Sequence, residues 1–163
     1  MFEIKEKKIW AGLRISLGLI FFWAFIDKVF GLGFATAPEK SWLNGGSPTA
    51  GFLEFGTHGP FESIFQAMAG SVIVDWLFMI GLALIGLSLI LGIGIKIAGY
   101  SGSVLMILMW LCVMPPEHNP LLDEHIIYLL VLLGLTTTDS GRYIGFGAWW
   151  EDTELVKKYK ILK

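Results

Sequence analysis

Three long apolar runs set the fold that this chain can adopt. They cover residues 9–30, 76–95 and 97–114, and the last run ends at Pro115-Pro116, where a helix cannot continue. About 20 apolar residues in a helix cross the hydrocarbon core of a bilayer. We therefore expect each run to form one membrane-spanning helix.

A fourth apolar run, at residues 126–135, is too short to cross a bilayer alone. The helix reaches spanning length if Asn119 is its N-cap and Pro120 lies in its first turn. From there to Thr138 it would be about 28 Å long at 1.5 Å per residue. The sequence thus predicts an all-α fold, a four-transmembrane-helix bundle whose last span is 119–138.

Composition supports a membrane location. Hydrophobic types make up 55% of the 163 residues, charged types make up 16%, and the mean hydropathy is +0.67. A soluble domain of this size cannot bury so much apolar surface, so we expect a single membrane domain (1–163) covered largely by the lipid bilayer. The net charge of −2 argues against a nucleic-acid partner. Because Cys112 is the only cysteine, an internal disulfide and a cysteine-rich metal site are excluded.

The basic residues predict the orientation. Lys5, Lys7 and Lys8 before an apolar run imitate a signal peptide, but the run is longer than the apolar core of one, so we interpret it as the first span. Ten of the twelve Lys and Arg residues lie on the side of both chain ends, and only Lys28 and Lys40 lie on the other. The cytoplasmic side carries the basic excess. We therefore expect a multi-pass protein of the cell membrane, with the N-terminus and the tail (139–163) in the cytoplasm.

The outer loop between the first two spans, residues 31–75, is too long to be structureless. Ser47-Pro48 resembles an N-cap followed by a first-turn proline, which predicts a short helix through Phe55. Gly59-Pro60 starts another. Four apolar residues of this second helix share one face: Phe61, Ile64, Phe65 and Met68. We expect a partly helical loop that lies on the bilayer surface or folds back over the bundle.

Two basic residues in the first span are candidates for function, because ionisable groups within a membrane are costly. Arg14 and Lys28 are fourteen residues apart, so they share a helix face near opposite membrane surfaces. Arg14 suits a snorkelling anchor as well as a binding role. For Lys28 the anchor interpretation is weaker, because its side of the membrane is poor in basic residues.

Polar groups gather at the outer ends of the first and last spans. Asp27 and Lys28 lie at a depth similar to that of Asp123, Glu124 and His125. We expect them to face one another in a polar pocket, where Lys28 neutralises carboxylates and His125 relays protons, since histidine titrates near neutral pH. The alternative is a solvated helix start, because acidic residues favour a helix N-terminus for dipole reasons alone.

A glycine-rich turn precedes the first loop helix, and its exposed N–H groups suit an oxyanion. The turn consists of Asn44, Gly45, Gly46, Ser47, Pro48 and Thr49. His58 and His118 fall in loops and suit ordinary surface histidines. No haem-attachment motif or metal-ligand pattern occurs, so the sequence indicates no haem, flavin or metal.

Several stretches resemble the DoxX/DoxD family of membrane proteins. Residues 13–22 leading to Asp27-Lys28, and the ending Asp139-Ser140-Gly141-Arg142-Tyr143-Ile144-Gly145, carry this likeness. Residues 42–49 and 119–125 resemble the subgroup labelled thiosulfate:quinone oxidoreductase large subunit. The resemblance covers residues 10–146. One departure is Phe25, which stands where the family usually has glycine.

The resemblance implies a four-helix membrane fold and, for some members, electron transfer from thiosulfate to membrane quinone. In that role Lys28, Arg14 and the turn at 44–49 would hold the anion, while His125 with Asp123, Glu124 or Asp27 would handle quinone protons. No side chain here stores electrons well, so the reaction needs direct transfer between bound substrates or a partner subunit.

Two other functions stay open. The first is a non-enzymatic membrane scaffold or binding subunit of a larger complex, either a homo-oligomer or an assembly with a second subunit, in which the buried charges pin the first helix to the fourth. The second is a small-molecule carrier, which is least favoured because the helices lack the paired broken halves typical of transporters.

Overall fold

The protein is all-helical in the computed structural model, which describes residues 2–163, apart from the side chains of residues 2–4. Four helices form the body of the molecule: α1 (Phe2–Phe30), α4 (Val72–Leu91), α5 (Ile95–Cys112) and α6 (Glu124–Thr137). Short helices fill the connections and the tail: η1 (Pro38–Lys40), η2 (Trp42–Asn44), α2 (Ala50–Phe55), α3 (Glu62–Gln66), η3 (Ser140–Arg142), α7 (Gly147–Glu151), α8 (Glu154–Lys158) and η4 (Lys160–Leu162). The predicted all-α class is confirmed for the described residues.

Three of the helices are long and apolar enough to cross a membrane. They are Lys5–Phe30 within α1, Val72–Leu91 and Ile95–Cys112, which confirms the three long runs predicted from sequence to within a few residues. Many large apolar side chains of these helices point outward, among them Leu77 and Val104, which are 69% and 58% exposed. Such surfaces suit a lipid bilayer.

The fourth helix is shorter than predicted, because α6 begins at Glu124 and not at Asn119. The Asn119 side chain accepts hydrogen bonds from the backbone N–H groups of Leu121 and Leu122, which closes a turn and not a helix. The N-cap is Asp123, whose carboxylate accepts from the first helical amides. At 14 residues, α6 is about 21 Å long, and by length it does not count among the spanning helices.

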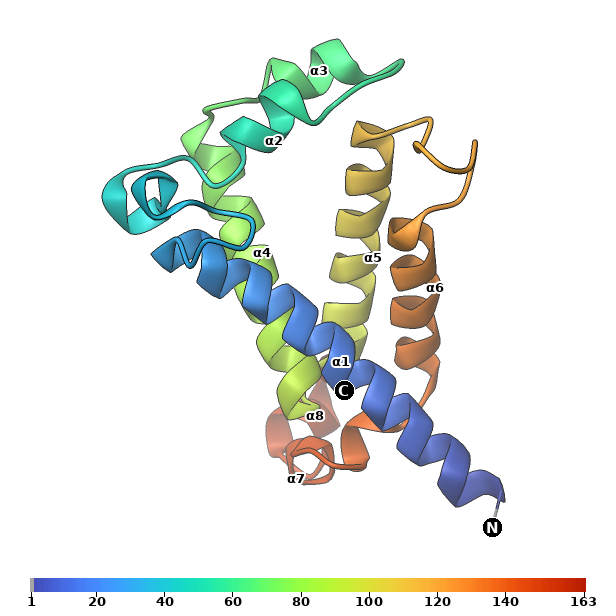
Figure 1. The fold of residues 1–163 in the computed structure, drawn as a ribbon. Coiled ribbons are helices and arrows are strands. Elements are labelled where there is room, and N and C mark those ends of the chain that lie inside the picture. The colour runs from blue at the N-terminus through green and yellow to red at the C-terminus, as the bar shows by residue number, and fades with distance from the viewer. Residues whose placement is uncertain (1) are drawn as a thin grey trace.

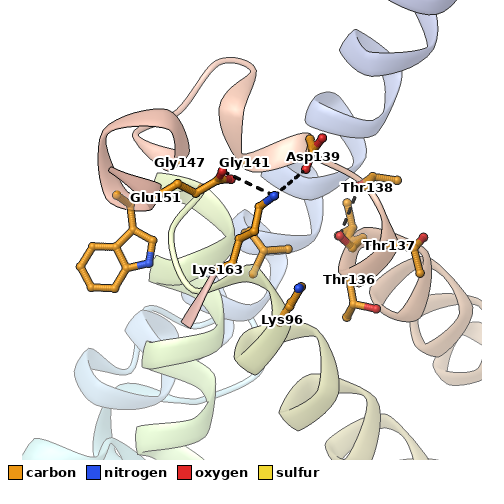
Figure 2. Close-up of a pocket in the computed structure, with 13 residues that line it drawn as sticks. Lys96, Thr136, Thr137, Thr138, Asp139, Gly141, Gly147, Glu151 and Lys163 are labelled. Atoms are coloured by element: carbon orange, nitrogen blue, oxygen red, sulfur yellow. Dashed lines mark hydrogen bonds and ion pairs between the residues drawn. The ribbon is translucent and has the colours of Figure 1, made fainter. Parts of the chain in front are cut away.

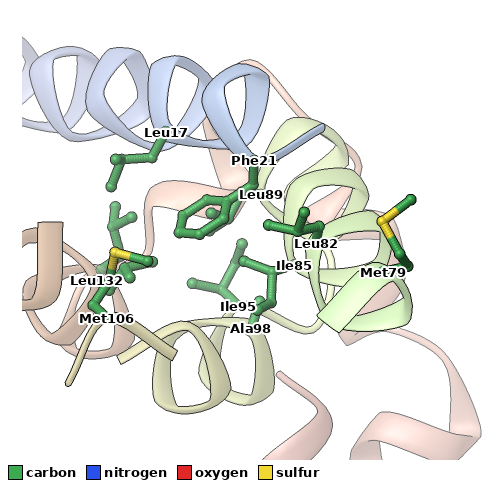
Figure 3. Packing of buried hydrophobic residues seen from close by; sticks show 11 residues of the cluster. Leu17, Phe21, Met79, Leu82, Ile85, Leu89, Ile95, Ala98, Met106 and Leu132 are labelled. Carbon is green, nitrogen blue, oxygen red and sulfur yellow. The ribbon is translucent and has the colours of Figure 1, made fainter. Parts of the chain in front are cut away.

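The body consists of two helix pairs. α1 packs along α4, α5 packs along α6, and α4 and α5 connect the pairs. Figure 1 shows α1 crossing the other helices obliquely, with α2 and α3 at one end of the bundle and α7 and α8 at the other. The buried core between the pairs includes Leu17 and Phe21 of α1, Leu89 of α4 and Leu132 of α6 (Figure 3).

Glycines allow close contact within the α1–α4 pair. A β-carbon at Gly18 would lie 2.8 Å from the backbone nitrogen of Ile90, and one at Gly86 would lie 2.7 Å from that of Phe22. Both distances are shorter than van der Waals contact, so only glycine permits this approach. Small residues at helix interfaces are typical of packing in lipid.

The outer loop contains the two short helices that the sequence predicts, and it folds back onto the end of α5. The backbone N–H of His58 donates to the Cys112 carbonyl oxygen at 3.0 Å, and its ring Nε2 lies 3.0 Å from the carbonyl oxygen of Pro115. Gly59, with φ +84°, sits so close that a β-carbon would collide with the Met114 carbonyl oxygen. Ile64 of α3 and Met68, which follows the end of this helix, are exposed, so this apolar surface suits contact with a bilayer.

Candidate functional site

The charged side chains divide between the two ends of the bundle. After the predicted orientation, we call the end that holds residues 91–96 and 138–163 the inner end. The end that holds residues 27–75 and 112–125 is the outer end.

Arg14 is fully buried at the inner end and bonds only to backbone carbonyls. Its guanidinium donates to the oxygens of Leu89 and Ile90 in the last turn of α4, at 3.2 Å for Ile90. It also donates to Tyr143 and Ile144, at 3.1 and 2.8 Å. The last carbonyls of a helix lack intrahelical donors, and its C-terminus favours a cation. Arg14 therefore joins α1, the end of α4 and the tail.

Glycines bring the tail onto the end of α4 beside Arg14. The backbone N–H of Phe146 donates to the Leu91 oxygen at 2.8 Å. A β-carbon at Gly145 would lie 2.8 Å from that same oxygen, and one at Gly141 would collide with the oxygen of Gly92. The motif at residues 139–145 thus supplies the small residues that this backbone contact needs.

Asp27 lies at the outer end, 1% exposed, and binds the chain's own amides. Its carboxylate accepts from the N–H groups of Ala35 at 2.8 Å and Phe34 at 3.3 Å. It therefore closes the turn that follows α1. The neighbouring Lys28 is half-buried, and its ammonium makes no hydrogen bond within the described residues.

The glycine-rich turn is filled by a carboxylate that sequence reasoning missed. Asp75, in the first turn of α4 and 6% exposed, accepts from the hydroxyls of Ser47 and Thr49 at 2.8 and 2.6 Å. It also accepts from the backbone N–H of Thr49 at 3.2 Å. The position of Asp75 one residue before the apolar run of α4 was the available signal. The carboxylate occupies the place that the sequence assigned to a bound oxyanion.

Three further donors of this turn are also used internally. The Asn44 side-chain amide donates to the Pro38 oxygen at 2.8 Å. The N–H of Gly45 donates to Trp42 and that of Gly46 donates to Ser41, each at 3.0 Å. These contacts close the turn on itself.

Asp123 and His125 form a pair at the start of α6. The Asp123 carboxylate accepts from the backbone N–H of His125 at 3.0 Å, and its second oxygen lies 2.7 Å from His125 Nδ1. Both side chains are largely buried, 10% and 16% exposed. Glu124 is exposed.

The polar groups expected to face one another are apart. Within the described residues, no hydrogen bond or ion pair joins Asp27 or Lys28 to Asp123, Glu124 or His125. Figure 1 shows the reason: the end of α1 lies against α4, and the start of α6 lies on the opposite side of the bundle. The oblique crossing of α1, which sequence periodicity does not reveal, separates the two groups.

A polar cavity of about 200 Å³ opens at the inner end, and sequence reasoning missed it (Figure 2). Its polar lining comes from the start of α5, the end of α6 and the tail: Lys96, Thr136, Thr137, Thr138, Asp139, Glu151 and Lys163. Apolar lining comes from Ile95, Leu135 and Trp150. The excess of basic residues in the segments at the inner end was the available sequence signal for this cavity.

Ion pairs connect one wall of this cavity. Lys163 Nζ lies 3.1 Å from Asp139 and 3.5 Å from Glu151, and Arg142 Nε lies 3.2 Å from Glu151. The hydrogen bond from Lys163 lowers the pKa of Asp139 below its ordinary value, and the same bond raises the pKa of Lys163. Lys96 has no ion pair within the described residues.

No known protein family, curated protein or solved structure matches this chain.

Proposed function

We propose that this protein is a DoxX-like integral membrane protein that serves as a non-enzymatic scaffold or binding subunit of a larger assembly. One observation carries the proposal: internal contacts already use three buried charges at places where a substrate anion or a proton-transfer group was expected. Arg14 binds four carbonyl oxygens, Asp27 binds two amides, and Asp75 occupies the turn at 44–49.

An anionic substrate would have to displace these contacts. Binding thiosulfate at Arg14 would remove the donor that serves the last carbonyls of α4, and a buried acceptor without a donor costs about 1–3 kcal/mol. Binding it at the turn would bring it next to the Asp75 carboxylate, which repels an anion. A structural role for these charges incurs neither cost.

We propose further that all four long helices cross the membrane, with both chain ends in the cytoplasm. The basic excess at the inner end supports this orientation. Because α6 is about 21 Å long, the hydrocarbon core, about 30 Å thick, must thin locally or cover part of residues 119–123. Such mismatch is tolerated at modest cost.

The test uses the intact protein in native membranes and after purification. We expect no thiosulfate-dependent reduction of quinone in either preparation, and we expect gentle crosslinking to recover a homo-oligomer or a second membrane subunit. Quinone reduction that depends on thiosulfate, or a protein that stays monomeric and uncrosslinked in its own membrane, would contradict the proposal.

A second candidate is a quinone-linked oxidoreductase subunit that takes electrons from thiosulfate or a similar small donor. The 2.7 Å contact between Asp123 and His125 favours it, because such a pair passes protons between water and a quinone head group. His125→Ala and Lys28→Ala would then abolish quinone reduction, and copurified quinone would be found. His118→Ala is the matched control, since this histidine lies in the exposed connection between α5 and α6.

A further inference from the structure

The inner cavity is lined by a lysine, Lys96, that makes no ion pair within the described residues. Asp139 pairs with Lys163, and Glu151 pairs with both Lys163 and Arg142. Each acid in the lining therefore has a basic partner, while Lys96 has none within the described residues. Lys96 is half-buried.

The position of Lys96 is unfavourable in the absence of an anion. It is the second residue of α5 (Ile95–Cys112), and the first turn of this helix contains no acidic residue. The helix dipole places partial positive charge at the N-terminus, which disfavours a cation there and favours an anion. The backbone N–H of Lys96 already donates to the Lys163 carbonyl oxygen at 3.0 Å, so the lysine ammonium is the group left to meet an anion in the cavity.

The threonines opposite Lys96 supply acceptors. The hydroxyls of Thr136, Thr137 and Thr138 donate to carbonyl oxygens one turn earlier, at 2.7, 2.8 and 3.2 Å. Their hydrogens are used, but each oxygen keeps a lone pair for an external O–H or N–H donor. Figure 2 shows Lys96 and Thr136 on two different helices around one space.

The cavity also adjoins the apolar surface of the helices. Ile95, Leu135 and Trp150 line it, and Ile97 and Leu133, one or two residues further into the bundle, are 46% and 38% exposed. A ligand with its anionic group at Lys96 can therefore lay an acyl chain along α5 and α6. At about 200 Å³ the cavity suits a head group, with the chains outside it.

From these features we infer that the inner cavity binds a phosphate group beside a hydroxylated moiety, as in an anionic phospholipid head group of the inner leaflet. The Lys96 ammonium holds the phosphate, and the three threonines accept hydrogen bonds from the hydroxyls. This site goes beyond the proposed function, and it lies at the opposite end of the bundle from His125.

Native mass spectrometry of the detergent-purified full chain tests the site, with phosphatidylglycerol and phosphatidylcholine as probes. We expect the protein to retain phosphatidylglycerol in preference to phosphatidylcholine. Lys96→Gln should lower that retention about five-fold, the effect of roughly 1 kcal/mol per lysine near an anionic lipid. Lys96→Arg should keep it within about two-fold, because the charge remains.

Lys160→Gln is the control, since this exposed lysine belongs to the same tail but lies outside the cavity lining. A second measurement, the melting temperature with added inorganic phosphate, separates a lipid from a free anion. If added phosphate raises the melting temperature of the native protein but not that of Lys96→Gln, the site binds a free anion. Lipid retention without that rise assigns it to a head group.

Equal retention of both lipids together with no effect of phosphate would overturn the inference. So would an unchanged response in Lys96→Gln. Because the Lys96 side chain makes no hydrogen bond or ion pair within the described residues, we expect this variant to melt like the native protein, and a melting curve on the same sample verifies it.

Discussion

The two ends of the bundle stabilise buried charges with opposite kinds of partner. At the inner end a single cation, Arg14, collects carbonyl oxygens from α4 and the tail. At the outer end two separate carboxylates, Asp27 and Asp75, collect N–H and hydroxyl donors from short loop segments. Cations match the carbonyls at helix ends, and anions match the amides of turns.

The two ends also differ in the sequence separation of the contacts that each charged side chain makes. Arg14 joins segments 75 and 130 positions away in sequence, whereas Asp27 reaches only eight residues and Asp75 reaches 28. One buried connection therefore joins three distant segments at the inner end, where a backbone hydrogen bond and ion pairs also hold the tail, and the outer end distributes its stability over several local connections. Loss of the first should unfold the protein globally, and loss of any of the others should open one loop.

The largest effect is expected from Arg14→Met. The change leaves the last carbonyls of α4 and those of residues 143–144 without a buried donor, at a cost of about 3 kcal/mol or more in the free energy of unfolding. Arg14→Lys should lose less, since one charge and some donors remain. Equilibrium unfolding in detergent measures both. Melting of Arg14→Met close to the native protein would contradict the central role of this residue.

The next effect is expected at the outer end from Gly59→Ala. The new methyl group would collide with the Met114 carbonyl oxygen, which separates the outer loop from α5 at a cost of about 2 kcal/mol. Gly33→Ala is the matched control, because Gly33 has nearly the same φ, +85°, and open space where the β-carbon would go. Gly33→Ala should lower the free energy of unfolding by about 1 kcal/mol, through backbone strain alone.

Hydrogen exchange locates this opening. In Gly59→Ala the amide of His58, which donates to the Cys112 oxygen, should lose its protection while the core amides of α4 and α5 keep theirs. Uniform loss of protection would mean that the outer end, like the inner one, governs the whole fold.

Sequence reasoning predicted the long helices because their signal is local. Apolar runs of spanning length and the Pro115-Pro116 stop need no knowledge of the fold. The start of α6 was placed wrongly, since Asn119 and Asp123 are equally good caps by residue type. Only the structure shows that Asn119 caps a turn and Asp123 caps the helix.

The candidate site was harder to predict, because it depends on how the helices cross. Asp27 and His125 were expected to face each other, but the oblique path of α1 separates the end of α1 from the start of α6 (Figure 1). The pairing of Asp75 with Ser47 and Thr49 links positions 28 and 26 residues apart. No periodicity connects them, so one sequence cannot predict that the turn is already filled.

A smaller, local effect is expected from Asp75→Ala. The hydroxyls of Ser47 and Thr49 lose their acceptor, at about 1.5 kcal/mol because water can reach part of the turn. Faster exchange of the amides in α2 measures it. Asp75→Asn should lose less stability, since one oxygen remains as an acceptor. Glu54→Gln, which changes an exposed acid of the same loop, should have no effect. If the α2 amides exchange equally fast in Asp75→Ala and Glu54→Gln, the contacts of Asp75 do not stabilise the outer end.

The smallest effect is expected from the ion pair of Asp139 and Lys163 at the inner end, which is partly exposed. The pKa of Asp139 is lowered, so its contribution is present above the ordinary value of 3.8 and is lost as pH falls through the folded-state pKa. The pKa of Lys163 is raised, so its contribution is present below 10.5 and is lost as pH rises through its folded-state pKa.

Asp139→Asn should therefore lower the stability by about 0.5 kcal/mol over the neutral range, and the difference from the native protein should vanish at low pH. Subtracting the two unfolding curves at each pH isolates this pair, because all other titrating groups are shared. In about 1 M salt the difference should shrink, since screening acts within a few ångströms there. A difference as large as that of Arg14→Met would instead make the tail, and not the buried arginine, the element on which the inner end depends.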